Sequence, residues 1–596
     1  MCGIVGYAGQ RPALPILIDA LKRLEYRGYD SAGVAVVQDG LTVVKDQGFI
    51  ANLEAHLPPL RGVVGIGHTR WATHGPPSPE NAHPFYDCKE RIAMAHNGII
   101  ENYAELRDEL RERGHTFRSQ TDTETVVHLI EENYKGNLED ALRAALARVV
   151  GTYAILAVSA DEPDKVVAAR NFSPLVVGLG ADENFLASDV PALLRHTDRV
   201  LYVMDREVVV ITPSSVRILD LEGKPVARDP QRVSWTLEDA ERGGFDHFML
   251  KEIHEQPQAI HNTLLGRMTE VDANGFFRNG FTGVKLVACG TSYHAALVGK
   301  YILEEVARVP TTVELASEYR YAPIPTERPL VILLSQSGET ADTLGAAREA
   351  RRRGSKTLGI TNIVGSSLTR ETDRTLYTRA GLEIGVAATK TFTAQLVALY
   401  LVAIRMGIER GTLAPEDANR LRDELRALPR AVQTVLNQSE AIEAIARAFA
   451  GHRDMFFIGR GINYPVSMEG ALKMKEISYI HAEAYAAGEL KHGPLALLTA
   501  DTPVVAVCVR DRNFEKMMGN VGEVNARGSP VIGIGTEGDR DLGKFVDRML
   551  TVPRVRDLLY PVAVTVVLQL FAYHAAKKRG CPIDKPRNLA KTVTVE

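Results

Sequence analysis

Short apolar runs that alternate with turn residues dominate the chain up to about residue 235. GTYAILAVS, KVVAARN and PLVVGLG are runs of this kind, and IGHTRWATHG and RIAMAHNGII each predict a strand followed by a turn. ENYAELRDELRERGH has apolar residues at helical spacing and Gly114 near its end, which predicts a helix. Together these patterns predict an α+β domain of antiparallel sheets flanked by helices, over residues 2–237.

The pattern changes to strand, Gly/Ser loop and helix beyond a polar stretch at 238–250, which we interpret as a linker. KLVACGTSYHAALVGKYILEEV and PLVILLSQSGETADTLGAAREARRRG are successive units of this new pattern. After a helical stretch, DMFFIGRGINYPVSMEGALKMKEI and TPVVAVCVRDRNFEKMMGNVGEVNARG repeat them. Apolar strands between helices of this length predict parallel, doubly wound sheets. We therefore expect two related α/β domains, at 251–424 and 425–586, and a separate tail at 587–596.

The bulk composition narrows the class of protein. The 596 residues are 45% hydrophobic and 24% charged, with a net charge of −4, which is typical of a soluble globular protein and offers no basic field for nucleic acid. No signal segment is evident. The apolar stretch YPVAVTVVLQLFAYHAA is interrupted by Gln569 and His574, so we expect a buried core helix that is too short and too polar to span a membrane. Five scattered cysteines without a CxxC pair indicate a reducing compartment, and we expect a cytoplasmic protein.

A candidate nucleophile lies at the start of the chain. Cys2 directly follows Met1, whose removal would place the thiol beside a free α-amine. That amine has a pKa of about 8, so part of it is neutral at physiological pH and can act as a general base. The motif HNGII adds two donors suited to an oxyanion, the side-chain amide of Asn97 and the backbone N–H of Gly98. Asn-Gly is also a common turn pair, and this motif alone favours a turn.

Two charged residues could hold an amino acid substrate. Arg70 can bind a carboxylate and Asp122 an ammonium group, although a lone charged residue more often belongs to a surface ion pair. Cys-Gly-Ile after the initiator Met, LEYRGYDSAG, GHTRWATHG, HNGIIEN and TDTE together resemble the class II glutamine amidotransferase family, with its N-terminal nucleophile (Ntn) hydrolase sandwich. The resemblance implies that Cys2 attacks the glutamine amide and that the Asn-Gly pair holds the oxyanion. It also implies that Arg70 and Asp122 bind glutamine and that Trp71 gates an ammonia passage.

Four histidines, at positions 68, 74, 83 and 96, surround these motifs. Their spacing is irregular, and the sequence has no HExxH and no paired Cys/His cluster. We therefore expect core or hydrogen-bonded histidines and no metal site.

Hydroxyl side chains follow two apolar strands in the C-terminal half. LLSQSGETADT and CGTS place these polar residues at strand–helix junctions: Ser335, Gln336, Ser337 and Thr340, and Thr291 and Ser292. Hydroxyls, backbone N–H groups and a helix N-terminus can form an anion cradle there, although Ser and Thr at such positions also serve as ordinary N-caps. Neither loop fits the Walker A or GxGxxG pattern, so two such loops favour a phosphate ester over a nucleotide.

A third group of residues could carry acid–base chemistry. EGALKMKEISY predicts a helix with Glu469, Lys473 and Glu476 on one face. A solvated ion-pair ladder has the same spacing, but the helix is otherwise apolar, which favours a cleft. AAGELKHGP places His492 in a glycine-flanked loop, where it could move protons near neutral pH. The tail supplies Lys591, which could form a Schiff base with a keto sugar if it lies in a pocket.

This half resembles the sugar isomerase (SIS) fold, and the joined architecture resembles amidotransferases that act on a sugar phosphate. The resemblance implies that L-glutamine and fructose 6-phosphate are the substrates, that glucosamine 6-phosphate is a product, that no cofactor is required, and that the chain forms a homodimer. The two hydroxyl loops would hold the phosphate. Lys591 would form an imine at C2 and His492 would assist ring opening. Glu476 would move a proton between C1 and C2, with help from Lys473. One departure is Ala388, where the family often has serine near the sugar.

Two alternatives follow from the same residues. An amidotransferase with a phosphoribosyl acceptor would need a loop of acidic pairs with Thr and Gly after a strand, and the chain has SQSGET in a tandem repeat instead. A sugar-phosphate-binding regulator without catalysis would lack the nucleophile, the proton-shuttling carboxylate or the imine lysine, and all three are present.

Overall fold

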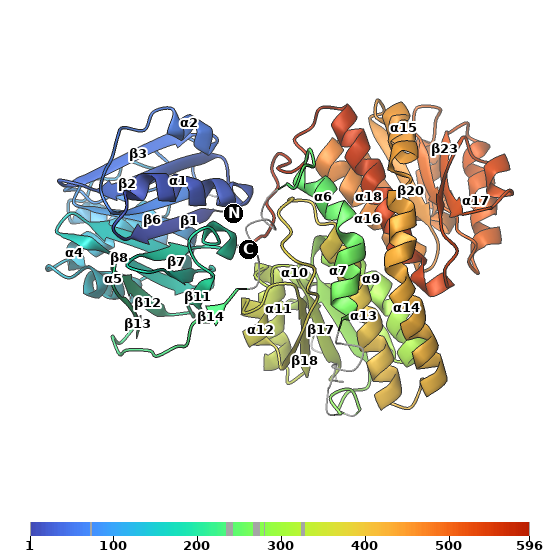
Figure 1. Ribbon diagram of the computed structural model, residues 1–596, viewed down its shortest axis with the longest axis horizontal. Coiled ribbons are helices and arrows are strands. Elements are labelled where there is room, and N and C mark those ends of the chain that lie inside the picture. Colours follow the sequence, from blue (N-terminus) through green and yellow to red (C-terminus); the bar gives the residue numbers. More distant parts are fainter. Residues whose placement is uncertain are drawn as a thin grey trace. The chain divides into compact units, whose positions relative to one another are not determined.

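The computed structural model in Figure 1 describes residues 2–71, 74–233, 242–265, 275–278, 280–323 and 328–594. The chain forms two compact units, one of Met1–Ala240 with Ala590–Glu596 and one of Glu241–Leu589. Met1 and positions 238–241 of the expected linker lie outside the described residues. Helix α6 (Phe248–His254) begins within the last part of that expected linker.

Two antiparallel sheets form the centre of the first unit. The first sheet has the strand order β14-β11-β9-β10-β1-β4-β2-β3 and the second β13-β12-β8-β7-β6-β5. The strands of the first sheet are β1 (Gly3–Ala8), β2 (Ser31–Val37), β3 (Leu41–Gln47), β4 (Val64–Arg70), β9 (Val176–Leu179), β10 (Asn184–Ala187), β11 (Arg199–Tyr202) and β14 (Gln231–Arg232). The strands of the second are β5 (Phe85–Tyr86), β6 (Ile92–Ile100), β7 (Gly151–Ser159), β8 (Glu162–Asn171), β12 (Glu207–Ile211) and β13 (Val216–Asp220).

The alternation of side chains along each strand divides the apolar residues of the first unit between two cores. On β7, Leu156 faces the first sheet and joins a core that includes Ile66, because successive side chains point to opposite faces. Its neighbour Ile155 faces the other way and packs with Leu129 and Leu142. The helices are α1 (Ala13–Leu24), α2 (Ile50–Glu54), α3 (Tyr103–Glu112), α4 (Glu124–Asn133) and α5 (Leu138–Leu146), with short 3-10 turns η1 (Glu25–Arg27) and η2 (Val190–Ala192). The expected sandwich of antiparallel sheets flanked by helices is confirmed.

Two parallel sheets form the second unit, and they have the same strand order. The orders are β16-β15-β17-β18-β19 and β21-β20-β22-β23-β24, with every neighbouring pair parallel. The strands are β15 (Val284–Ala288), β16 (Thr311–Leu315), β17 (Leu330–Leu334), β18 (Thr357–Thr361), β19 (Arg374–Tyr377), β20 (Asp454–Gly459), β21 (His481–Ala486), β22 (Val504–Val507), β23 (Val531–Thr536) and β24 (Arg548–Val552). The expected pair of doubly wound sheets is therefore confirmed.

One apolar core extends through both repeats from Met249 to Ile583, and two smaller cores form around Leu344 and around Phe514. Helices cover the sheets. They are α7 (Gln256–Leu264), α9 (Gly290–Ile302), α10 (Ala316–Tyr319), α11 (Ala341–Arg352), α12 (Ser367–Glu371), α13 (Lys390–Glu409), α14 (Pro415–Leu436), α15 (Ser439–Phe449), α16 (Asn463–Ser478), α17 (Phe514–Asn525) and α18 (Tyr560–Lys578). A π-helix (Leu303–Ala307) and 3-10 turns η5 (Ala487–His492), η6 (Pro494–Leu497), η7 (Leu542–Lys544) and η8 (Asp557–Leu559) complete the set. The expected boundary between residues 424 and 425 falls inside α14, which is continuous.

Among the described residues of this unit, two apolar helical segments are long enough to cross a membrane. Lys390–Glu409 and Asp557–Lys578 pass by length and composition, so the expectation that the late segment is too short and too polar was wrong on both counts. The core placement of that segment is confirmed, because Tyr560–Ala576 are all buried inside the unit. Burial of this kind is typical of the core helix of a soluble protein.

Candidate active sites

Cys2 directly precedes strand β1, and its thiol contacts Trp71, which directly follows β4. Its Sγ accepts the backbone N–H of Trp71 at 3.3 Å and lies 3.6 Å from the Trp71 carbonyl. Burial raises the pKa of the Cys2 thiol, while the Trp71 N–H and the charge of Arg70 act in the opposite direction. A pocket opens beside the thiol, and its lining is Cys2, Arg70, Trp71, His83, His96, Gly98, Thr121, Asp122 and Thr123. Five of the predicted site residues therefore share one pocket.

Asn97 and Gly98 lie within strand β6 and not in a turn, so the expected turn after RIAMAH was wrong. The ladder with β7 continues past them to the pair of Ile100 and Gly151. Gly98 has φ of 139°, and a Cβ there would lie 2.0 Å from the Thr152 carbonyl, so this position requires glycine. The Asn97 Nδ2 donates to the Cys2 carbonyl at 3.1 Å, which places the amide next to the candidate nucleophile.

Arg70 and Asp122 are both buried, at 3% exposure each. The guanidinium of Arg70 donates to the carbonyls of Pro76 at 3.2 Å and Gly75 at 3.0 Å, and also to that of His74. Asp122 accepts the backbone N–H of Ile100 at 2.8 Å. These contacts hold a cation and an anion on the wall of one pocket, which suits the carboxylate and ammonium of an amino acid. Neither residue is a solvated surface ion pair.

Three of the four histidines near the pocket are core residues. His68 is fully buried, its Nε2 lies 3.0 Å from the His96 carbonyl, and its ring stacks on His83 at 4.1 Å. The Nδ1 of His96 lies 2.8 Å from Thr123 Oγ1. Burial lowers the pKa of His68 to about 3 and also lowers the pKa values of His83 and His96. His74 is half-buried, and its Nδ1 lies 3.8 Å from Asp122 Oδ1. The expected hydrogen-bonded histidines are confirmed.

The hydroxyl loop SQSGET joins β17 to α11. Its side chains turn toward one another, with Ser335 Oγ 3.0 Å from Thr340 Oγ1 and accepting the Gly338 N–H at 3.0 Å. Ser337 Oγ accepts the backbone N–H of Glu339 at 3.2 Å. Gly338 has φ of 65°, and a Cβ there would lie 2.1 Å from Ser366 Oγ, so only glycine fits this turn. Hydroxyls and a helix N-terminus are thus gathered at one place, as an anion site requires.

The corresponding loop of the second repeat differs in chemistry. It joins β22 to α17 and contains Arg510, whose guanidinium forms an ion pair with Asp539 at 2.7 Å. In the first repeat, the Gln336 carbonyl accepts the Asn362 N–H at 3.0 Å, which fixes the loop to the end of β18. The two repeats share a fold, but the hydroxyl cradle belongs to the first.

Helices α9 and α16, which follow the corresponding strands β15 and β20 in the two repeats, share a buried polar cluster. Lys473 Nζ lies 2.5 Å from Glu476 Oε2, 3.4 Å from Glu469 Oε1 and 3.1 Å from Thr291 Oγ1. Glu469 also accepts from Thr291 Oγ1 at 3.0 Å and lies 2.7 Å from His294 Nδ1. The predicted face of α16 is confirmed, and it is not a solvated ladder, because the Lys473 side chain is fully buried and Glu469 is 1% exposed.

Electrostatics keeps this cluster charged. Burial lowers the pKa of Lys473, but the two neighbouring carboxylates outweigh that effect, and its pKa is raised overall. Burial raises the pKa of Glu469, but Lys473, His294 and Thr291 together lower it below its usual value. The Glu476 side chain is 20% exposed, so it is the accessible carboxylate of the cluster. His294 was missed by the sequence reasoning, although it follows Thr291 by three positions on α9 and so shares a face with it.

Three predicted residues remain, and they lie in other contacts or elements. Ser292 is buried and accepts from Gln395 Nε2 at 2.9 Å, so it contacts α13. His492 is exposed and ends the 3-10 turn η5, where the sequence predicted a loop. Lys591 belongs to the tail that groups with the first unit.

Comparison with known families matches both halves of the chain. A glutamine amidotransferase domain matches residues 68–195, and an SIS domain matches twice, at 284–405 and 448–579. Full-length relatives named glutamine–fructose-6-phosphate aminotransferase (isomerizing) are similar throughout. Those of Thermus thermophilus, Methanosarcina acetivorans and Aquifex aeolicus are 52%, 50% and 50% identical, with 100% of both chains covered.

Solved structures resemble the second unit. The C-terminal domain of glucosamine-fructose-6-phosphate aminotransferase from Francisella tularensis is 39% identical with a TM-score of 0.56, and covers 58% of this chain and 99% of its own. A putative tagatose-6-phosphate ketose/aldose isomerase from Clostridium novyi is 16% identical, with a TM-score of 0.51 over 58% of this chain and 93% of its own. The second likeness concerns the fold alone.

Proposed function

The chain belongs to the glutamine–fructose-6-phosphate aminotransferase (isomerising) family, and from that premise we propose how its residues divide the reaction. The enzyme converts fructose 6-phosphate and L-glutamine to glucosamine 6-phosphate and L-glutamate, the first step toward hexosamines. The full-length relatives carry this activity in their name, which sets aside the phosphoribosyl-acceptor amidotransferase and the non-catalytic regulator.

We propose that Cys2, exposed by removal of Met1, attacks the side-chain amide of glutamine. The free α-amine takes the thiol proton and passes it to the amide nitrogen, which leaves as ammonia when the tetrahedral intermediate collapses to a γ-glutamyl thioester on Sγ. Water then hydrolyses the thioester to glutamate and restores the thiol. Asn97 and Gly98 supply the oxyanion donors, supported by the 3.1 Å bond from the Asn97 amide to the Cys2 backbone. Arg70 and Asp122 bind the substrate carboxylate and ammonium, while Trp71, whose backbone contacts the thiol, covers the exit for ammonia.

In the second unit we assign phosphate binding to the SQSGET loop, with Ser335 and Thr340 as its closest hydroxyl pair. Glu476 shuttles the proton between C1 and C2, because it is the accessible carboxylate of the α16 cluster. Lys473 orients it through the 2.5 Å ion pair. His492 assists ring opening, and Lys591 forms the imine at C2 with loss of water. Ammonia from glutamine then displaces the lysine amine at C2. The sequence motifs of the family support the roles of Lys591 and His492.

Thr291 and Ser292 take roles that their contacts support. Thr291 Oγ1 bonds to Glu469 and lies beside Lys473, so we assign it to fixing the proton-transfer cluster and not to the phosphate. Ser292 is buried against Gln395, and we assign it to the packing of α9 on α13.

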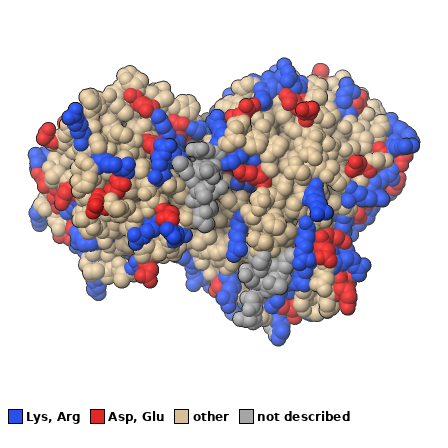
Figure 2. Space-filling model, in the orientation of Figure 1, with Lys and Arg blue, Asp and Glu red and all other residues tan. Residues whose placement is uncertain are grey.

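Two coarser properties complete the proposal. All five cysteines are free, which is consistent with a reducing compartment, and we propose that the enzyme acts in the cytoplasm. We also propose a homodimer, as the family resemblance implies. On the face shown in Figure 2, basic and acidic side chains are interspersed, which suits small anionic substrates rather than a nucleic acid partner.

The single observation that carries the function is the glutamine pocket, which Cys2, Arg70, Asp122 and Gly98 line together. The direct test is incubation of the purified enzyme with glutamine and fructose 6-phosphate, with the products identified by mass. We expect glutamate and glucosamine 6-phosphate. Glutamate without an amino sugar would contradict the acceptor, and unchanged glutamine would contradict the nucleophile.

A further inference from the structure

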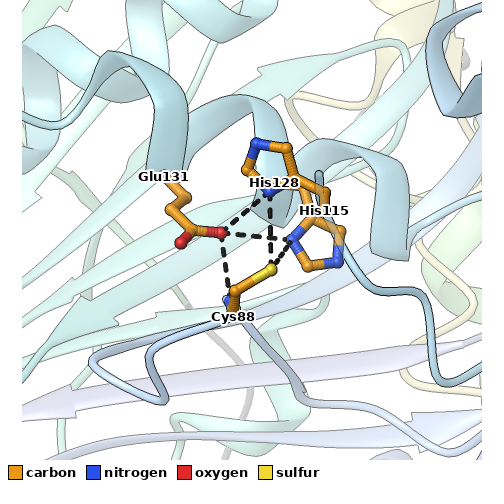
Figure 3. Close-up of side chains that lie close together, drawn as sticks. All are labelled: Cys88, His115, His128 and Glu131. Carbon is orange, nitrogen blue, oxygen red and sulfur yellow. Dashed lines mark hydrogen bonds and ion pairs between the residues drawn. The ribbon is translucent and has the colours of Figure 1, made fainter. Parts of the chain in front are cut away.

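Four side chains with metal-binding atoms converge in the first unit, on residues that the proposed reaction does not use (Figure 3). They are Cys88, His115, His128 and Glu131, and their ligand atoms all lie within 4.8 Å of one another. Cys88 lies in the loop between β5 and β6, and His115 follows α3. The other two lie on α4 at positions i and i+3, which share one face of a helix.

The distances between these atoms approach those of a tetrahedral ion site. Cys88 Sγ lies 3.5 Å from His115 Nδ1 and 3.6 Å from His128 Nδ1. Glu131 Oε2 lies 3.1 Å and 3.3 Å from the same two nitrogens. Zinc–ligand bonds of about 2.0–2.3 Å at tetrahedral angles would separate sulfur from nitrogen by about 3.6 Å and nitrogen from oxygen by about 3.3 Å.

Further contacts orient the ligands toward one centre. The outer nitrogen of each imidazole faces a carboxylate. His115 Nε2 lies 3.6 Å from an oxygen of Glu132, and His128 Nε2 lies 3.9 Å from an oxygen of Glu124. A carboxylate behind the outer nitrogen favours a proton there, which leaves Nδ1 free to ligate a metal. The backbone N–H of Cys88 donates to Glu131 Oε2 at 3.0 Å and fixes that oxygen as well.

We propose that Cys88, His115, His128 and Glu131 bind one Zn²⁺ ion as a structural site. One thiolate, two imidazoles and one carboxylate form a borderline-soft donor set, which favours zinc over magnesium or calcium. Four protein ligands close the coordination sphere, which is the arrangement of structural rather than catalytic zinc. The ion would tie the β5–β6 loop and the end of α3 to α4. Thr123 and Asp122, which line the glutamine pocket, directly precede that helix.

The sequence offers little sign of this site. The ligands are spread over 44 positions, from 88 to 131, without a CxxC or HExxH pair, and only the fold brings them together. The alternative is a hydrogen-bonded cluster of the same four side chains with no ion, and such a cluster would neither bind zinc nor be stabilised by it.

The test begins with the full-length enzyme, purified without chelator and analysed for metal by mass spectrometry. We expect close to one zinc per chain. A Cys88→Ser variant should bind zinc at least about 10-fold more weakly, while Cys581→Ser, which changes a half-buried cysteine of the other unit, should keep the wild-type content. After removal of the metal, adding Zn²⁺ should raise the melting temperature of the wild type and of Cys581→Ser, and should leave Cys88→Ser unchanged.

Two additions keep the proposal falsifiable if Cys88→Ser folds poorly. Glu131→Gln keeps the volume of the side chain and removes the anionic ligand, so it should also bind zinc at least about 10-fold more weakly. Cobalt added to the metal-free wild type should give a thiolate-to-cobalt charge-transfer band, absent from Cys88→Ser and present in Cys581→Ser. The proposal is overturned if the metal-free wild type neither binds zinc nor gains stability from it, or if zinc binding is the same in Cys88→Ser and Glu131→Gln as in the wild type.

Discussion

The glutamine site and the sugar site differ in how many of their proposed residues share one pocket. In the first unit, one pocket already contains the thiol, the glycine of the oxyanion motif, the cation and the anion. In the second unit, the SQSGET loop makes its contacts within the first repeat, while the α16 cluster joins the two repeats through Thr291. Lys591 belongs to the tail that groups with the other unit. A preformed pocket can bind glutamine without rearrangement, whereas the groups proposed for the sugar reaction come from both repeats and from the tail.

The largest expected effect separates the two sites completely. Cys2→Ala removes the nucleophile, so glutamine hydrolysis and glutamine-dependent synthesis should fall by a factor on the order of 10³ or more. The variant should still convert fructose 6-phosphate to glucose 6-phosphate, because Glu476 and Lys473 are intact. A coupled assay for glucose 6-phosphate measures this conversion. Retained glutamine turnover would remove Cys2 from the mechanism.

Glu476→Gln should have the reverse selectivity. Loss of the shuttling carboxylate should slow the ketose–aldose step by about 10²–10⁴-fold, a usual contribution for a general acid–base group. Glutaminase activity without sugar should stay near the wild-type rate. Glu515→Gln, which changes an acidic residue in the first turn of α17, is a matched control and should leave both rates unchanged. If Glu476→Gln isomerises fructose 6-phosphate normally, another group moves the proton.

Lys591→Arg tests whether the tail completes the sugar site. Arginine keeps the charge but cannot form the imine, so amino-sugar synthesis should fall by about 10² or more. Borohydride reduction in the presence of fructose 6-phosphate should attach the sugar to the wild type, with the adduct located at Lys591 by peptide mass spectrometry. A trapped adduct in the Lys591→Arg protein would refute the assignment.

A smaller effect is expected from the phosphate loop. Ser335→Ala with Thr340→Ala removes two hydroxyls, and hydrogen bonds to a charged group contribute about 1.5–3 kcal/mol, so KM for fructose 6-phosphate should rise at least about 10-fold. Arg512→Ala alters the corresponding loop of the second repeat, where its exposed side chain pairs with Glu305, and should leave KM unchanged. Equal changes in the two variants would show that the repeats do not differ in phosphate binding.

The smallest effect concerns the stability of the first unit in acid. Burial holds the pKa of His68 at about 3, well below the usual 6.5 of histidine, and lowers those of His83 and His96. The unfolded chain binds protons below about pH 6.5 that the folded unit does not, so stability falls as the pH drops below that value. From pH 7.5 to pH 5.5 the free energy of unfolding should fall by about 1.4 kcal/mol for each histidine that stays neutral in the folded state. Urea unfolding followed by tryptophan fluorescence measures it, and both tryptophans precede residue 240. A flat profile would contradict the prediction.

The sequence predicted most of the fold because its periodicity is strong. The apolar run of β7 and the repeated strand–loop–helix units correspond to observed elements. The turn expected at Asn97 failed because glycine at 98 also permits a strand that passes close to Thr152. The boundary expected after residue 424 falls in a continuous helix because it divided the helical stretch expected between the two repeats, and this helix packs on α7 and α18.

The candidate sites were predicted unevenly for a related reason. Residues within short motifs, such as Arg70 and Trp71, line one pocket together with Cys2. Contacts between distant segments were not predicted: Thr291 was expected beside a phosphate, yet it bonds to Glu469 across 178 positions. The cluster around Cys88 shows the same limit, because no spacing rule relates residues on two loops and a helix.

The coupling of the two sites is the central claim, and one measurement tests it directly. Glutamine that carries heavy nitrogen in its side-chain amide is supplied with fructose 6-phosphate, and the amino sugar is analysed by mass spectrometry. We predict that glucosamine 6-phosphate carries the heavy nitrogen when the wild-type enzyme is used, and that Cys2→Ala forms no labelled product. An unlabelled amino sugar from the wild type, or a labelled one from Cys2→Ala, would contradict the account.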